Sequence, residues 1–207
     1  MKKKRPREAV IISPTDAAAL LRKAVLAEDW TSLSFIALGF FAGIRPMELR
    51  KKFKGASAIY LDWCNVTPDG IAIHSELAKT AARVIPIHDP LPLWIDFIRK
   101  KRGMLSGPVV ATGKRGGGWR KHWEAFLANH WVHEWHADQL RHSFGSYRMA
   151  VVQNAGQVAM EMGNSAQVLL DHSWNWKTKG AKAKEFWLLT PKAMMTFGGD
   201  SALAKKV

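Results

Sequence analysis

The stretch DQLRHSFGSYRMA, residues 138–150, predicts a helix whose first turn carries unexpected charges. Apolar side chains recur along it at helical spacing, at Leu140, Phe144 and Tyr147. Asp138 stands where an N-cap is expected, yet Arg141 and His142 follow where the helix dipole favours negative side chains. An anion held by these two side chains and the helix N-terminus would explain the pattern. A surface ion pair of Arg141 with Asp138 or Glu134 would explain it as well.

The charge balance of the whole chain favours the anion. There are 31 Lys and Arg residues against 17 Asp and Glu residues, which gives a formal net charge of +14 and a sequence pI near 10.1. A single domain this basic usually binds nucleic acid or, less often, an anionic membrane.

Three further features limit the class of protein. The longest apolar run, residues 34–44, is too short to span a bilayer and ends at Arg45. No secretory signal is visible, because the start MKKKRPR leads into no long apolar segment. The lone cysteine, Cys64, excludes an internal disulfide and fits a reducing compartment. We therefore expect a cytoplasmic protein with no membrane partner.

Helix signals indicate one folded domain over residues 13–190, with a basic linker or tail at 1–12 and a C-terminal tail at 191–207. Ser13 is the expected N-cap of the first helix, with Pro14 in its first turn. Further helices are expected from about Thr31 to Gly43, at 46–53, at 91–101 and at 119–129.

Residues 57–88 predict a small sheet. Three short β-rich runs, separated by turn residues, are AIYLDW (58–63), GIAIHSE (70–76) and ARVIPI (82–87). We expect them to form a three-stranded antiparallel sheet with Lys79 at the tip of its second turn. The predicted fold class is α+β and mainly α, with helices around this sheet.

Two polar segments give weaker signals. The run ATGKRGGGWR, residues 111–120, carries Lys114 and Arg115 and is typical either of a loop that contacts a nucleic-acid backbone or of a solvated linker. It is not a phosphate loop, because no Ser or Thr follows the lysine. His130, His133 and His136 are spaced three apart in an aromatic-rich segment, and we expect no metal site there.

Four motifs in order resemble the catalytic domain of tyrosine recombinases, the phage-integrase superfamily. They are AGIRPMEL (42–49), AKTAARVIPI (78–87), DQLRHSFGSY (138–147) and MGNSAQVLLDHS (162–173). The resemblance covers residues 13–190 and implies the mainly helical fold of that family, with double-stranded DNA as the partner. It also implies DNA recombination or integration, the chemistry of mobile genetic elements, without a metal or other cofactor.

By this resemblance, Arg45 and Arg141 bind the scissile phosphate and Lys79 protonates the leaving 5′-oxygen. The chemistry is sound, because bidentate guanidiniums stabilise charge on non-bridging oxygens and a positioned acid neutralises the departing alkoxide. His142 and His172 stand beside the matched positions and are further candidates for DNA contacts, together with Lys114 and Arg115.

The sequence departs from the family pattern at three expected catalytic positions. Asp138 replaces the histidine of the H-x-x-R motif, Asn164 replaces a histidine or tryptophan, and Ser173 replaces the nucleophilic tyrosine. An alkyl hydroxyl is far harder to ionise than a phenol, whose pKa is near 10. A serine oxygen also lies about 4 Å closer to its Cα than a tyrosine hydroxyl. We expect Ser173 near the two arginines but short of an in-line attack.

Two functions therefore remain open. The chain is either a recombinase or integrase catalytic domain that is impaired as written, or an inactive recombinase-derived domain that keeps its phosphate clamp and binds DNA. Ser173→Tyr separates them, because recovered strand cleavage favours the first. A third interpretation is a basic helical domain that binds RNA and is unrelated to recombinases, but the four ordered motifs would then be a coincidence. In a bacterial or phage host we expect association with the nucleoid.

The segment after Gly163 predicts a short helix, residues 165–172, with Val168 and Leu169 facing the core. A final helix should then bury Phe186, Trp187 and Leu189. By analogy with the resembled family, this segment packs either on its own domain or in the groove of a second copy bound to DNA.

Overall fold

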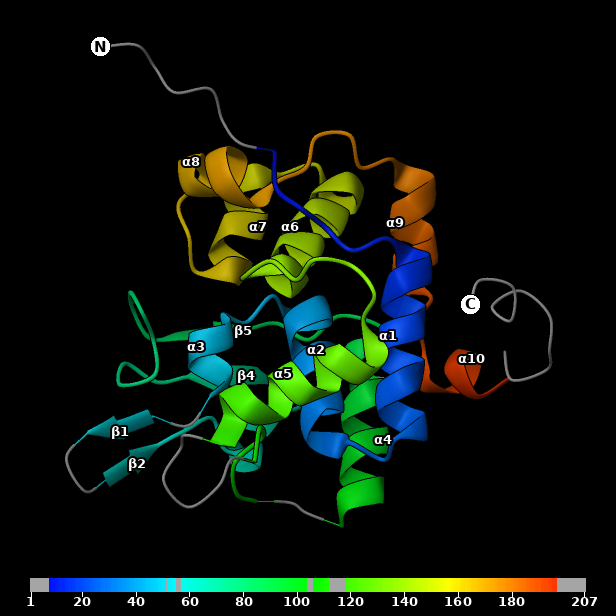
Figure 1. The fold of residues 1–207 in the computed structure, drawn as a ribbon. Helices are drawn as coiled ribbons and strands as arrows, with labels where there is room; N and C mark the ends of the chain where they lie inside the picture. Colours follow the sequence, from blue (N-terminus) through cyan, green and yellow to red (C-terminus); the bar gives the residue numbers. More distant parts are fainter. Residues whose placement is uncertain (1–7, 51, 55–56, 104–105, 112–117, 197–207) are drawn as a thin grey trace.

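The computed structural model describes residues 8–50, 52–54, 57–103, 106–111 and 118–196. Its fold is α+β and mainly α, as predicted, with a three-stranded sheet at one side of the helices (Figure 1). None of the helices in these ranges is long and apolar enough to cross a bilayer.

The first two helices begin where the sequence predicts. α1 (Pro14–Leu26) starts at Ser13, whose hydroxyl accepts a hydrogen bond from the backbone N–H of Asp16 at 3.1 Å. α2 (Trp30–Ala42) ends at Gly43, which has the left-handed φ of 60° that glycine adopts most easily.

α2 forms the centre of the core. It is buried along most of its length, because it packs against α1, α4 (Leu91–Arg102) and α6 (Gln139–Val152). α5 (Gly118–His130) lies outside it, and its Trp119 and Trp123 contact Phe35 of α2. The helices predicted at 91–101 and 119–129 are confirmed.

The three-stranded antiparallel sheet is confirmed, but its first strand is not the predicted one. The sheet has the order β3 (Val66–Thr67), β4 (Gly70–Ile73), β5 (Arg83–Ile85). The run AIYLDW lies outside this sheet, because its first residues pair in a separate hairpin of β1 (Lys52–Lys54) and β2 (Ser57–Ile59).

Two further differences follow from this hairpin. α3 (Pro46–Leu49) ends before β1 begins, so the helix predicted over residues 46–53 is too long. After β2, the carbonyl of Leu61 accepts from Val109 N–H at 2.9 Å, and the next turn is a short 3-10 helix, η1 (Trp63–Asn65). One backbone hydrogen bond of this β-rich run is therefore made with Val109, which is distant in sequence.

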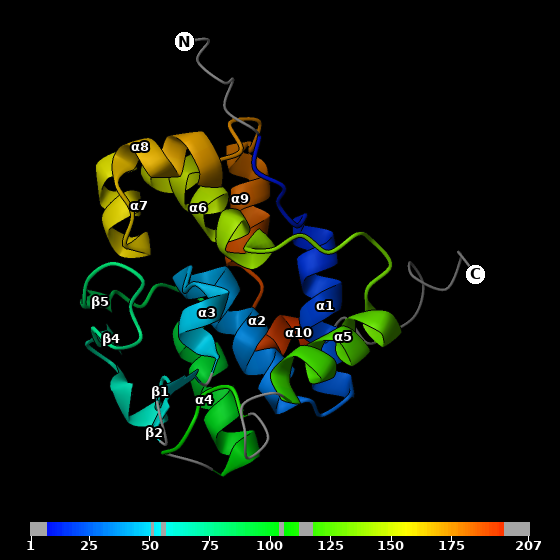
Figure 2. The same cartoon turned by 60° about the vertical axis from the view of Figure 1, so that its left-hand side comes forward.

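α6 and the four helices that follow it lie at the opposite end of the molecule from the β1–β2 hairpin (Figures 1 and 2). These four are α7 (Ala155–Met162), α8 (Ala166–Val168), the π-helix η2 (Leu169–Ser173) and α9 (Gly180–Trp187). Leu169 is buried here in a second small core, as predicted. Val168 is 42% exposed, contrary to the prediction, and is the last residue of α8 before the π-helix begins.

Both ends of the described chain pack on this same domain. α9 contacts α6 and α1, and Phe186 is fully buried as predicted. α10 (Pro191–Thr196) buries Met194, so folded structure continues past residue 190, where the sequence predicts a tail. At the other end, the carbonyl of Ile12 accepts from the hydroxyl of Tyr147 at 2.9 Å, which connects the segment before α1 to α6.

Candidate phosphate-binding site

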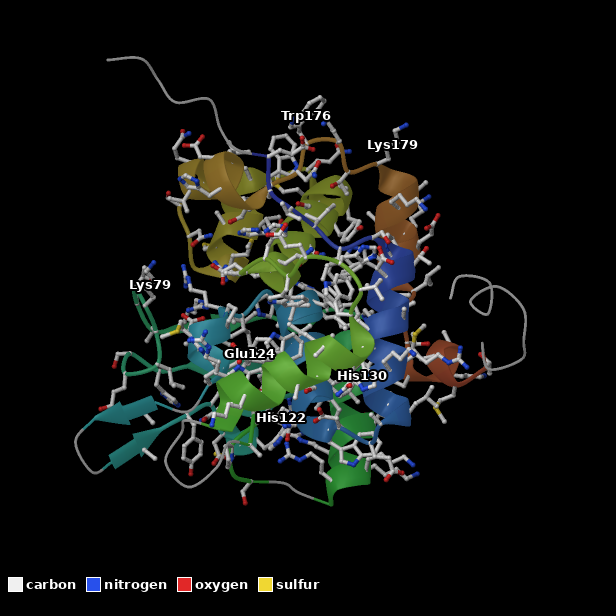
Figure 3. The ribbon with its side chains drawn as sticks, in the orientation of Figure 1. Lys79, His122, Glu124, His130, Trp176 and Lys179 are labelled. Carbon is white, nitrogen blue, oxygen red and sulfur yellow. The ribbon has the colours of Figure 1, made fainter. Side chains whose placement is uncertain are left out.

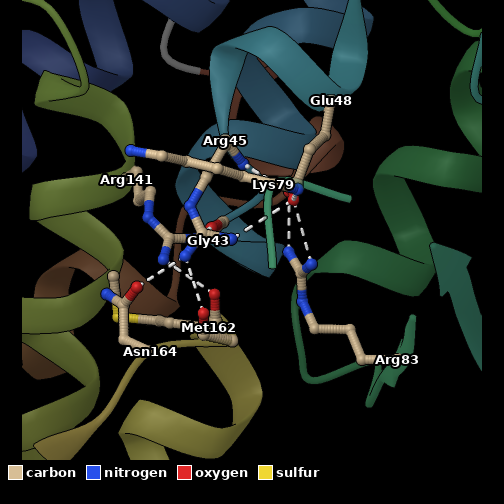
Figure 4. A network of polar contacts seen from close by, with 9 residues as sticks. Gly43, Arg45, Glu48, Lys79, Arg83, Arg141, Met162 and Asn164 are labelled. Carbon is tan, nitrogen blue, oxygen red and sulfur yellow. Dashed lines mark hydrogen bonds and ion pairs between the residues drawn. The ribbon is translucent and has the colours of Figure 1, made fainter. Parts of the chain in front are cut away.

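Arg45 lies at the sharp junction between α2 and α3. It is the N-cap residue of α3, and its backbone N–H donates to the Glu48 carboxylate at 3.2 Å. Its Nη2 donates to the Gly163 carbonyl and to Oδ1 of Asn164, each at 2.6 Å, and its Nη1 donates to Glu48 at 3.2 Å. The guanidinium is therefore held from two sides (Figure 4).

Arg141 lies in the first turn of α6 and is only 3% exposed. Its Nη1 donates to the carbonyl of Gly43, and its Nη2 donates to that of Met162 at 2.7 Å. Burial, together with repulsion by the nearby Arg45 charge, lowers the pKa of the Arg141 guanidinium to about 9. The side chain remains charged at neutral pH.

The alternative of a surface ion pair for Arg141 is wrong. Its two terminal nitrogens donate to buried carbonyls rather than to Asp138 or Glu134. Asp138 does occupy the N-cap position of α6, but with a left-handed φ of 61° and no capping hydrogen bond from its side chain. It therefore does not act as the predicted cap.

The two guanidiniums meet at the C-terminal end of α7. The last carbonyls of a helix have no partner within the helix, and here Met162 and Gly163 offer theirs to Arg141 and Arg45. The partial negative charge at a helix C-terminus favours cations at this place. Gly163, at φ 65°, ends the helix and turns the chain toward Asn164.

A buried carboxylate supports this arrangement from the side of the sheet. Glu48 is fully buried, and its two oxygens accept from Nη1 and Nη2 of Arg83 at 3.0 and 2.7 Å (Figure 4). Burial raises the pKa of the Glu48 carboxyl, but the bonds and charges of Arg83 and Arg45 outweigh this and lower it. Sequence analysis missed Arg83, whose signal is an arginine within an otherwise apolar β-rich run.

All eight predicted site residues in the described ranges line one open cavity of about 740 Å³. They are Arg45, Lys79, Asp138, Arg141, His142, Asn164, His172 and Ser173. Lys79 is exposed and projects from the loop between β4 and β5 (Figure 3). Lys114 and Arg115 lie outside the described residues.

The π-helix η2, which follows α8, contributes Ser173 and His172 to the cavity lining. Ser173 ends the π-helix η2 and is 5% exposed, with its carbonyl 3.4 Å from the donating hydroxyl of Ser146. π-helical turns are rare and often mark functional sites. Across the cavity, burial lowers the pKa of His142 and the Arg141 charge lowers it further, against the opposing charge of Asp138.

The charges of this cavity suit an anion. Guanidiniums from α3 and α6 and the ammonium of Lys79 border the same space, and buried Glu48 compensates only part of their charge. Within the described ranges, no group of three or more His, Cys, Asp or Glu side chains is placed to hold a metal ion. His133 and His136 instead approach Asp16 and Glu134, at 3.6 and 3.9 Å.

The comparison with solved structures supports the fold. The chain is similar to a crystal structure of XerA recombinase, with a TM-score of 0.54 and 13% sequence identity. The alignment covers 93% of this chain and 65% of that one, so the chain spans less than two thirds of the XerA structure. No family model matches the chain, and no curated protein does.

Proposed function

We propose that this recombinase-like domain binds duplex DNA by holding one backbone phosphate between Arg45 and Arg141. The observation that carries the proposal is the convergence of two guanidiniums, from separate helices, on one cavity at the end of α7. Guanidiniums bind phosphate through paired N–H donors, and a site that is already assembled loses little entropy on binding. The net charge of +14 supplies the long-range attraction.

The proposed reaction class is DNA strand cleavage and rejoining, as in site-specific recombination or integration. In this scheme a nucleophile attacks the phosphorus, the bond to the 5′-oxygen breaks, and Lys79 gives a proton to that oxygen. Arg45 and Arg141 stabilise the charge on the non-bridging oxygens. Asp138 and Asn164 line the same cavity as hydrogen-bonding groups.

Cleavage is impaired in the chain as written, because Ser173 occupies the place of the nucleophile. The hydroxyl is short and hard to ionise, and the backbone on either side of it is fixed by Leu169 in the small core and by Asn175, whose N–H donates to Ser146 at 2.8 Å. The alternative is an inactive domain that binds DNA only. The cavity lining favours the first function, because it retains Lys79 in addition to the phosphate clamp.

A nicked suicide duplex tests the proposal. We expect no covalent protein–DNA adduct from this chain on denaturing electrophoresis, and an adduct from Ser173→Tyr. If Ser173→Tyr folds, binds the duplex and still forms no adduct, the inactive DNA-binding domain is the better description. An adduct formed by the unmodified chain and abolished by Ser173→Ala would overturn the assignment of impaired cleavage.

Binding is tested separately by fluorescence anisotropy with a labelled duplex of mixed sequence. The affinity should fall steeply with salt. Arg45→Gln should weaken binding more than Arg120→Gln, which removes the same charge from the exposed pair between Arg120 and Glu124 on α5. Equal losses for the two variants would contradict a phosphate clamp at Arg45.

A further inference from the structure

We propose that Arg83 is a positioning residue that places Lys79 at the phosphate site, acting through Glu48. The inference rests on the proposed function of the cavity. Arg83 is the first residue of β5, and its side chain is 11% exposed. Both of its terminal nitrogens bind the two oxygens of Glu48, a bidentate contact that lysine cannot reproduce.

Glu48 connects the two sides of the site. The carboxylate that binds Arg83 also accepts from the backbone N–H of Arg45 at 3.2 Å and from that of Lys79 at 3.4 Å. The N-cap residue of α3, the loop between β4 and β5, and the first residue of β5 therefore share one buried anion. Of the two contacts that Glu48 makes on the side of the sheet, the ion pair with Arg83 is shorter than the hydrogen bond from Lys79 N–H.

Arg83 lines the cavity with its guanidinium bound to Glu48. Its Nη1 and Nη2 are used by Glu48. Its Nε is buried, and a Cβ at Gly163 would lie 2.7 Å from it, so this atom faces the end of α7. The side chain is thus enclosed by α3, β5 and the turn at Gly163. Arg83 lines the same cavity as Lys79, and the contact that connects it to the Lys79 backbone runs through Glu48.

Lys79 is the residue that most needs such support. It is exposed and lies in a loop, and in the described part of the chain its ammonium makes no ion pair. Arg45, by contrast, keeps its own contacts with Glu48, Gly163 and Asn164. Loss of Arg83 should therefore free the Lys79 loop while leaving Arg45 held, and a misplaced ammonium contributes less to a bound phosphate.

A double-mutant cycle between Arg83→Gln and Lys79→Ala tests the inference, with duplex affinity as the measurement. We expect each single variant to weaken binding about fivefold, the scale of one charge-assisted contact. The double variant should bind no more weakly than Lys79→Ala alone, because Arg83 has nothing left to position. Losses that multiply would show that Arg83 acts independently of Lys79 and would overturn the inference.

Two controls separate this result from a general loss of structure. Arg83→Lys keeps the charge opposite buried Glu48, so it should fold; hydrogen exchange in residues 74–82 should nevertheless become faster, with α2 unchanged. Exchange in 74–82 that is unaffected by Arg83→Lys and by Arg83→Gln would overturn the inference.

If Arg45→Gln does not weaken binding, the proposed function fails. If Arg45→Gln weakens binding but the losses of Arg83→Gln and Lys79→Ala are additive, only the role of Arg83 fails.

Discussion

Gly163→Ala should destabilise the protein more than Gly103→Ala, although the two glycines end helices at nearly the same backbone angle. Their φ values are 65° after α7 and 63° after α4. A Cβ in this left-handed conformation costs about 1–2 kcal/mol at either position, so the backbone contribution cancels in the comparison. A Cβ at Gly103 would meet nothing within 4 Å.

At Gly163 the same Cβ would lie 2.7 Å from Nε and 2.8 Å from Cδ of Arg83. Arg83 cannot move aside freely, because both of its terminal nitrogens are bound to Glu48. Forcing one extra carbon into such a packed place costs about 1–3 kcal/mol. The expected gap in unfolding free energy between the two variants is therefore about 1–3 kcal/mol.

Urea unfolding of both variants under identical conditions measures this gap, and duplex anisotropy adds a functional readout. Gly163→Ala should also weaken DNA binding, because the Gly163 carbonyl holds Arg45. Gly103→Ala, in a turn remote from the cavity lining, should bind as the parent does. Equal destabilisation by the two substitutions would refute the tight packing of Arg83 against the end of α7.

Two further predictions concern buried carboxylates. Glu48→Gln should lower the unfolding free energy by about 3–5 kcal/mol, because it leaves two largely buried guanidiniums without their anion; Glu124→Gln, in an exposed pair on α5 (Figure 3), should leave the urea midpoint unchanged. Burial raises the pKa of Glu161, but hydrogen bonds from His88 and Arg148 outweigh this and lower it to about 2. Its stabilising effect is therefore complete above about pH 5 and is lost as pH falls toward 2, so Glu161→Gln should flatten the acid side of a melting-temperature profile.

Local signals in the sequence were sufficient for the start of α1 and the end of α2. Ser13 with Pro14 predicts the start of α1, and Gly43 predicts the end of α2, because capping and left-handed turns depend on one or two residues. The family resemblance carried by the four ordered motifs predicted that Arg45 and Arg141 share one site, and both line the same cavity.

Contacts between distant residues could not be predicted in this way. The β-propensity of AIYLDW is real, but nothing in it indicates pairing with β1 or the bond from Leu61 to Val109. Arg83 gave no local signal for its contact with Glu48, which is 35 positions away. The burial of Arg141 also depends on the carbonyl ends of two other helices, which a first-turn charge pattern does not reveal.

The shared phosphate clamp is tested most directly by arginine side-chain NMR. The measurement follows the Nε–H resonances of Arg45 and Arg141, assigned by substitution, during titration with a short duplex. Both resonances should shift and saturate at the same DNA concentration, while that of exposed Arg120 moves little. Saturation at different concentrations, or shifts confined to Arg120, would contradict a single phosphate held by both guanidiniums.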